Sequence, residues 1–194
     1  MTRPPPAGFE LYVVRHGLTD WNADRKIQGH TDIPLNKQGI EQAESLAAQI
    51  SRFRFDLVLS SDLIRAFQTA QILTRQSGMP VITDRRLREI NMGQFEGQRW
   101  EDIIRLHAPH AYAKNAEEKR GFDGESLRDV ANRLKSIFAE YEQRLPGGKI
   151  LIVTHGLTAG ILHCMVNGID LLEAYSHVPE NCVIRRYLWP GKST

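Results

Sequence analysis

The chain has 194 residues, of which 41% are hydrophobic and 25% are charged, and its formal net charge is +2. This length and composition are typical of a single soluble globular domain. The small net charge argues against nucleic acid or an anionic membrane as a partner, and no apolar run of about 18 residues is present to span a bilayer.

The first ten residues, MTRPPPAGFE, contain three prolines and lack the apolar core of a signal peptide. We interpret residues 1–8 as a flexible lead and residues 9–194 as one domain.

The two cysteines, Cys164 and Cys182, form no C-x-x-C pair and lie among apolar residues, so we expect both to be free and buried. These features favour a cytoplasmic protein, because thiols stay reduced in that compartment.

Five segments have the composition of β-strands, and helical patterns alternate with them. The predicted strands are, in chain order, 9–14, 56–60, 81–83, 149–155 and an alternating edge strand at 182–189. The predicted helices are 36–52, 61–76, 126–145 (with Ser126 as N-cap and Asp129 three residues later) and a last one from residue 156. Strands that alternate with helices predict a three-layer α/β/α sandwich with a mostly parallel sheet.

Residues 93–125 break this alternation. The segment carries Trp100, two histidines and several glycines. We therefore expect it to form an excursion over one end of the sheet, above the active site.

Polar and charged side chains follow four of the predicted strands. In chain order they are Arg15-His16, Ser60-Ser61 with Arg65 in the next helical turn, Glu89, and Thr154-His155. Ligands of open parallel sheets bind outside the carboxyl ends of the strands, so these side chains are expected to converge. Two arginines and a helix amino terminus together suit a dianionic group such as phosphate.

Each of these residues also has an ordinary structural explanation. A lone histidine beside a strand is more often a satisfied polar group, and Glu89 could simply pair with Arg88 or another arginine. The functional interpretation depends on the whole set: a neutral histidine can attack phosphorus, and a carboxyl group can protonate the leaving alkoxide. The remaining histidines, His30, His107, His110, His163 and His177, show no metal-ligand spacing, so no metal or other cofactor is expected.

The blocks RHGLTDWNADRKIQGHTDIPLNKQG, SSDLIRAFQTA, LREINMGQFEG, DGES and VTHGLTAGILHC follow one another between residue 11 and about residue 165. In this order they resemble the signature of the histidine phosphatase superfamily, in the branch that includes phosphoglycerate mutases and related phosphatases. The resemblance implies a phosphoglycerate mutase-like fold, with His16 as the phosphorylated nucleophile and Glu89 as proton donor. It implies a phosphate pocket of Arg15, Arg65 and His155, and a phosphate or substrate side lined by Thr19, Asn22, Gln28, Gly29 and Gly156.

Three departures from the mutase pattern favour hydrolysis. Leu18 stands where many relatives carry Glu or Gln, Gln28-Gly29 replaces the mutases' Gly-Trp, and no Arg-His-Tyr triplet follows Glu89. The sequence therefore predicts a metal-independent phosphatase that hydrolyses a small phosphate monoester through a phosphohistidine on His16.

The alternatives are a phosphoglycerate mutase and a non-catalytic module that binds a phosphorylated ligand. Such a module should have lost one of the central site residues, and this chain retains them all. The family implies sugar phosphates, phosphoglycerates and α-ribazole phosphate as candidate substrates. The sequence is compatible with a homodimer.

Overall fold

The computed structural model describes residues 8–190, and within that range the side chains of residues 108–111 are not described. Nearly all of the predicted flexible lead, 1–8, thus lies outside the described residues, as does the side chain of His110. Among the described residues, no helix has the length and apolar character needed to cross a bilayer.

Five strands form one sheet in the order β3-β2-β4-β1-β5. Their bounds are β1 Phe9–Arg15, β2 Leu57–Ser60, β3 Ile82–Thr83, β4 Lys149–Thr154 and β5 Ile184–Trp189. Strands β1 to β4 pair in parallel, and β5 runs antiparallel to β1 at one edge. The predicted mostly parallel sheet with an edge strand at the end of the chain is confirmed.

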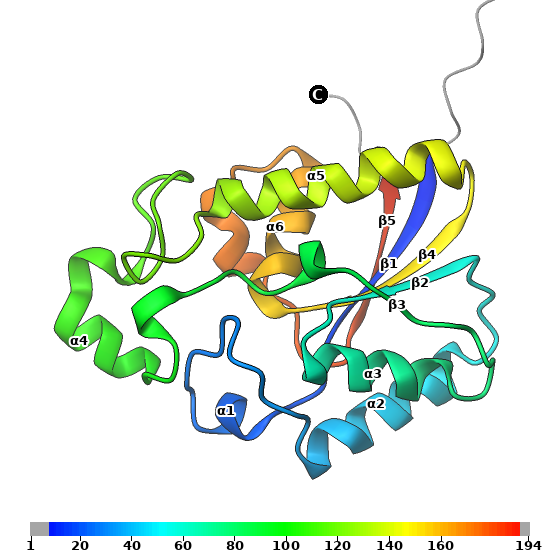
Figure 1. Cartoon of the computed structure of the whole chain (residues 1–194), viewed down its shortest axis with the longest axis horizontal. Coiled ribbons are helices and arrows are strands. Elements are labelled where there is room, and N and C mark those ends of the chain that lie inside the picture. Colours follow the sequence, from blue (N-terminus) through cyan, green and yellow to red (C-terminus); the bar gives the residue numbers. More distant parts are fainter. Residues whose placement is uncertain (1–7, 191–194) are drawn as a thin grey trace, which may run out of the picture.

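Helices cover both faces of this sheet (Figure 1). Helices α2 (Lys37–Ile50) and α3 (Ile64–Thr74) pack on one face, and α5 (Leu127–Arg144) and α6 (Gly156–Asn167) pack on the other. Because strand side chains alternate, Tyr12 and Val14 of β1 belong to one core and Leu11 and Val13 belong to the other. This arrangement confirms the three-layer sandwich.

Local capping signals explain where two of these helices begin. The Ser126 hydroxyl accepts a hydrogen bond from the Asp129 amide at 3.1 Å, and the Asp129 carboxylate accepts one from the Ser126 amide at 2.8 Å. This reciprocal pair is the predicted N-cap of α5. Helix α3 begins at Ile64, later than the predicted residue 61, because the Ser61 hydroxyl instead accepts from the Leu63 amide in the preceding turn.

The segment 93–125 contains a helix that the sequence did not predict, α4 (Trp100–Ala111). Its backbone departs from helical geometry at His107 (φ −132°, ψ 32°). The regular helix before this residue is short, and a short helix gives only a weak periodic pattern in the sequence. Its start is tied to an earlier loop, because the Trp100 amide donates to the Arg25 carbonyl at 3.1 Å and the Gly97 amide donates to the Ile27 carbonyl at 2.8 Å.

Shorter helical segments complete the described chain. They are α1 (Asp20–Ala23), η1 (Arg85–Leu87), η2 (Gly93–Phe95) and η3 (Leu171–His177).

The carboxyl ends of β1, β2 and β4 lie at the same end of the sheet, since Arg15 pairs with Thr154 and Ser60 pairs with Val153.

Candidate active site

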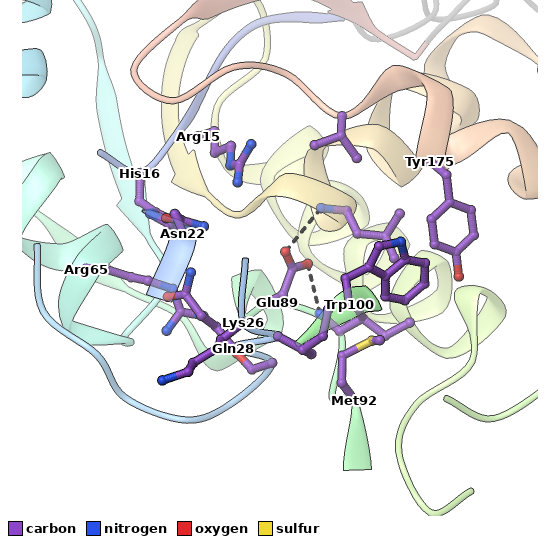
Figure 2. A pocket seen from close by; sticks show the side chains of 15 residues that line it. Arg15, His16, Asn22, Lys26, Gln28, Arg65, Glu89, Met92, Trp100 and Tyr175 are labelled. Carbon is purple, nitrogen blue, oxygen red and sulfur yellow. Dashed lines mark hydrogen bonds between the residues drawn. The ribbon is translucent and has the colours of Figure 1, made fainter. Parts of the chain in front are cut away.

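A cavity of about 240 Å³ lies at these strand ends and collects most of the predicted site residues. Seven of the ten line it: Arg15, His16, Asn22, Gln28, Gly29, Arg65 and Glu89. Figure 2 shows Arg15, His16 and Arg65 on one side of Glu89. The other three predicted residues, Thr19, His155 and Gly156, lie behind the lining.

His16 directly follows β1 and is held from three directions. Its amide donates to the Thr154 carbonyl at 3.0 Å, and its carbonyl accepts from the Asn181 side chain at 2.7 Å. Its ring Nδ1–H donates to the Gly17 carbonyl at 2.7 Å, which leaves Nε2 as the unprotonated nitrogen. Burial, together with the charges of Arg65 and Arg15, holds the pKa of His16 well below its usual 6.5, so the ring is neutral at neutral pH.

Arg65, in the first turn of α3, is completely buried, and each of its three side-chain nitrogens makes one hydrogen bond. Its two terminal nitrogens donate to the carbonyls of Thr31 and Gly29, both at 2.8 Å, and its Nε donates to Nδ1 of His155 at 3.2 Å. Burial lowers the pKa of the guanidinium to about 10, which leaves it positively charged at neutral pH. The site therefore holds a rigidly oriented cation.

His155 connects Arg65 to the end of β2. Since its Nδ1 accepts from Arg65, its Nε2 carries the proton and donates to the Ser61 hydroxyl at 2.8 Å. Burial and the neighbouring charge of Arg65 hold the pKa of His155 well below 6.5, so this ring is also neutral. Ser61 was expected to converge with the other polar residues at the strand ends, but the resemblance assigned it no role in the phosphate pocket.

Arg15, the last residue of β1, supplies the second cation of the cavity. One terminal nitrogen donates to the Pro179 carbonyl at 2.9 Å, whereas its buried Nε has no hydrogen-bond partner. A Cβ atom on Gly156 would stand 3.3 Å from that Nε, so a glycine here leaves room for the guanidinium. An unpartnered buried donor beside a cavity suits an incoming anion.

Glu89 caps the amino terminus of α6. Its Oε1 accepts from the amides of Ile90 and Thr158 and from the Thr158 hydroxyl, each at 3.0 Å, and its Oε2 accepts from the Leu157 amide at 3.1 Å. Dashed lines in Figure 2 mark two hydrogen bonds of the Glu89 carboxylate. Arg88 instead binds Asp62 through two nitrogens, at 2.7 and 2.6 Å, which rules out the Arg88–Glu89 ion pair as the explanation of this carboxylate.

Some backbone amides at the two helix amino termini of this site already have carboxylate partners. The Ile64 amide, at the start of α3, donates to the Asp32 carboxylate at 2.7 Å, and the first amides of α6 donate to Glu89. Carboxylates of the chain itself thus accept from the Ile64 amide at α3 and from the Leu157 and Thr158 amides at α6.

Asn22 and Gln28 line the cavity, whereas Thr19 is fully buried behind it. The Thr19 hydroxyl accepts from the Asn22 amide, and the Asn22 side-chain oxygen accepts from the Thr19 amide, each at 3.2 Å. Thr19 was expected to line the phosphate or substrate side. It instead lies behind the cavity lining and orients Asn22. The side-chain oxygen of Gln28 is buried without a partner, which leaves it available to a ligand.

Glu96 is a site-supporting residue that the sequence analysis missed. Its carboxylate accepts from the His30 amide at 2.8 Å, from the Thr31 amide at 3.0 Å and hydroxyl at 2.7 Å, and from the Met92 amide at 3.2 Å. It thereby holds the loop whose carbonyls orient Arg65. Gly29 has a φ of +50°, and a Cβ there would lie 1.9 Å from Glu96 Oε1. Its conformation and its closeness to Glu96 both require glycine.

Eight further residues line the cavity, and none of them was a predicted site residue. They are Lys26, Ile27, Ile90, Met92, Trp100, Leu157, Tyr175 and Val178. Seven of these side chains are largely apolar. Trp100 belongs to α4, Leu157 to α6 and Tyr175 to η3, and the others come from loops, so only the folded chain brings this set together.

The histidines outside the cavity have other partners. His30 donates through Nε2 to the Glu89 carbonyl at 2.8 Å, and Nδ1 of His163 lies 3.1 Å from the Tyr187 hydroxyl. Within the described residues, no three His, Cys, Asp or Glu side chains are grouped so that they could hold a metal ion.

A sequence model described as histidine phosphatase superfamily (branch 1) matches residues 11–193. The chain belongs to the histidine phosphatase superfamily. The predicted family membership is therefore confirmed, and the order of Arg15-His16, Arg65, Glu89 and His155 along the chain is the order of the blocks that predicted it.

Curated relatives of this superfamily member carry mutase names. The chain is 40% identical over 153 residues to phosphoglycerate mutase-like protein 4 of Arabidopsis thaliana, a match that takes in 76% of this chain and 66% of that protein. It is 34% identical over 183 residues to the probable phosphoglycerate mutase GpmB of an Enterobacter species, over 92% of this chain and 84% of that one.

Solved structures similar to this superfamily member carry phosphatase names. A mycobacterial glucosyl-3-phosphoglycerate phosphatase in complex with VO3 superposes with a TM-score of 0.83 at 28% identity, over 94% of this chain and 99% of that chain. The α-ribazole phosphatase of Shigella flexneri superposes with a TM-score of 0.81 at 27% identity, over 91% and 89% of the two chains.

Proposed function

We propose that this protein hydrolyses a small phosphate monoester, without a metal ion or other cofactor, through a phosphohistidine on His16. The observation that carries the proposal is the hydrogen bond from His16 Nδ1–H to the Gly17 carbonyl, 2.7 Å long. It leaves Nε2 of a neutral ring as the nucleophile in a cavity that also contains Arg15, Arg65 and Glu89.

In the first step, the two guanidinium groups bind the phosphoryl oxygens and offset their negative charge. Nε2 of His16 forms a bond to phosphorus while the bond from phosphorus to the ester oxygen breaks. Glu89, in its protonated form, gives its proton to the departing alkoxide, and the alcohol leaves. The Nδ1–H of His16 stays on the Gly17 carbonyl throughout and supports the positive charge that the phosphorylated ring acquires.

In the second step, water replaces the alcohol. Glu89, now a carboxylate, takes a proton from the water as its oxygen attacks phosphorus, and the bond from phosphorus to Nε2 breaks. Inorganic phosphate leaves, and His16 returns to its neutral form. Oε2 of Glu89 suits this exchange, because it accepts from one amide, whereas Oε1 accepts from two amides and shares the Thr158 hydroxyl with the Arg88 carbonyl.

Two lining residues favour hydrolysis over phosphoryl return to a phosphoglycerate. Ile90 and Met92 follow Glu89 where the resemblance places the Arg-His-Tyr triplet of the mutases, and both line the cavity. Apolar side chains at these positions offer no charged or hydrogen-bonding contact that would hold a dephosphorylated acid for a return reaction. The names of the curated relatives keep the mutase as the second candidate.

A labelling experiment tests the covalent step. Brief reaction with a radiolabelled phosphate ester, stopped by denaturation, should leave phosphate on the protein that is stable in alkali and lost in acid. His16→Ala should abolish both label and turnover. His163→Ala, on α6 beside Tyr187, should retain both. Label that persists in His16→Ala would refute the assignment of the nucleophile.

Product analysis separates hydrolysis from mutase activity. The protein is incubated with 3-phosphoglycerate, and inorganic phosphate and 2-phosphoglycerate are measured over time. Release of inorganic phosphate without isomerisation supports the phosphatase. Isomerisation without phosphate release would identify a mutase.

A further inference from the structure

Much of the cavity is walled by largely apolar side chains from separate parts of the chain. They are Ile27 from the loop after α1, Ile90 and Met92 after Glu89, Trp100 from α4, Leu157 from α6, and Tyr175 and Val178 from the η3 region. Figure 2 shows Met92, Trp100 and Tyr175 on the side of Glu89 that faces away from His16 and Arg65. We call these seven residues the apolar wall.

The aromatic part of the apolar wall is held in place before any ligand binds. Trp100 packs edge-on against Tyr112 with ring centres 5.2 Å apart, and Tyr112 packs edge-on against Tyr175 at 6.0 Å. The Trp100 amide also donates to the Arg25 carbonyl. Fixed rings of this kind give a flat contact surface at little entropic cost, so they suit a ligand with an apolar body.

The charges beside the apolar wall disfavour a second acidic group on the substrate. Beyond Arg15 and Arg65, the one positively charged side chain among the residues that line the cavity is Lys26. Its Nζ lies 3.3 Å from an Asp24 carboxylate oxygen and 5.9 Å from the centre of the Trp21 ring. A substrate carboxylate would have to displace Asp24 from Lys26 or lose its water against apolar side chains without a partner.

We propose that the natural ester carries an uncharged, largely apolar or aromatic alcohol, and that Trp100 determines this preference. The inference rests on the proposed function, since the phosphoryl group is taken to lie at Arg15 and Arg65 and the alcohol to extend past Glu89. Each methylene-sized group that the wall covers should raise kcat/KM by about fourfold if its burial is realised in the transition state. The preference therefore grows with the apolar size of the alcohol and falls when that alcohol bears a carboxylate.

The test compares three primary phosphate esters whose reacting ends are alike: ethyl phosphate, 2-phenylethyl phosphate and 3-phosphoglycerate. We expect kcat/KM for the phenylethyl ester to exceed that for the ethyl ester at least about tenfold, and to exceed that for 3-phosphoglycerate. Trp100→Ala should bring the ratio of phenylethyl to ethyl towards one, and Trp100→Phe should retain most of it because a ring remains. Leu106→Ala, an exposed position on the same helix, should leave the ratio unchanged.

The ratio distinguishes a specificity role from a loss of folding, because misfolding lowers both rates together. Equal kcat/KM for the ethyl and phenylethyl esters, or a preference for 3-phosphoglycerate, overturns this inference while the proposed phosphatase stands. A ratio that survives Trp100→Ala overturns the role of Trp100. Failure of the proposed function has a different signature: none of the three esters releases phosphate and no phosphoprotein forms.

Discussion

The Nε atom of Arg65 donates a hydrogen bond to Nδ1 of His155, 3.2 Å away, so that the permanent charge of the arginine sets the tautomer of the histidine. The other two nitrogens of the same guanidinium bind the Gly29 and Thr31 carbonyls. One buried side chain thus joins the loop before α2, the start of α3 and the end of β4. Its planar shape is what allows three bonds in three directions.

Arg65→Lys should therefore be far from conservative. A lysine ammonium keeps the charge but cannot make the three bonds at once, so the bound phosphoryl group loses an oriented donor. We expect kcat/KM to fall by about a hundredfold or more, and the inhibition constant for inorganic phosphate to rise. Arg75→Lys, at the exposed end of the same helix, is the control and should change neither constant. An unchanged phosphate inhibition constant in Arg65→Lys would remove Arg65 from the phosphate pocket.

Glu89→Gln should affect esters in proportion to how poor their leaving groups are. An alkyl alkoxide needs a proton as it departs, whereas an aryl oxide leaves without much help. Rates with alkyl phosphates should fall at least tenfold further than rates with 4-nitrophenyl phosphate, and Glu44→Gln on α2 should resemble the wild type. Steady-state rates across a series of leaving groups give the comparison, and equal losses throughout would leave Glu89 with a purely positional role.

The two buried histidines predict lower stability in mild acid. The pKa values of His16 and His155 lie well below 6.5 in the folded protein because of burial and the nearby arginines, and return to about 6.5 in the unfolded chain. Below pH 6.5 the unfolded chain binds protons that the folded protein does not, so the free energy of unfolding falls as the pH falls. Above pH 6.5 this contribution is constant.

The slope for each histidine can reach about 1.4 kcal/mol per pH unit below 6.5. Urea unfolding at pH 7.5 and pH 5.5 measures it, in a range where the ordinary carboxylates stay ionised. His155→Gln should reduce the difference between the two pH values, because it removes one of the two groups. Equal or greater stability at pH 5.5 would contradict a neutral, buried pair.

Gly29→Ala tests the contact between the loop that holds Arg65 and the Glu96 carboxylate. The added methyl group would lie 1.9 Å from Glu96 Oε1, at a backbone φ of +50° that alanine rarely adopts. We expect a loss of about 1–3 kcal/mol of stability together with weaker phosphate inhibition, measured by urea unfolding and by inhibition kinetics. Gly78→Ala has a similar φ of +65° but no neighbouring atoms within 4 Å, so it should cost stability alone.

Chelation should leave activity intact. The positive charge that would offset the phosphoryl group comes from Arg15 and Arg65, and the carboxylates nearest to them accept hydrogen bonds from backbone amides. Activity before and after dialysis against EDTA gives the measurement, with vanadate as a positive control for filling the pocket. Activity that disappears on dialysis and returns with added Mg²⁺ or Zn²⁺ would refute the metal-independent mechanism.

The positions of the strands and of four helices along the chain, and the family, were open to prediction because each is marked by short stretches of sequence. Apolar strands that end in Arg15-His16 and Thr154-His155 mark the carboxyl edge of the sheet, and Ser126 with Asp129 marks the start of α5. Helix α4 was not predicted, because its backbone is non-helical at His107 and the apolar pattern of the remaining regular helix is short. The role of Glu96 was not predicted, because its carboxylate binds backbone amides, and residues of any type can supply such amides.

The sequence by itself determined which side chains could meet: two arginines, two histidines and a carboxylate at adjacent strand ends, in the order of one superfamily. Only the tertiary structure decided their proton positions, since these depend on partners such as the Gly17 carbonyl and the Arg65 guanidinium. It also decided that Asp32 and Glu89 occupy the helix termini, and that an apolar wall lies beyond Glu89. Hydrogen bonds and cavities arise between segments far apart in the chain, and their geometry exists only once those segments are packed.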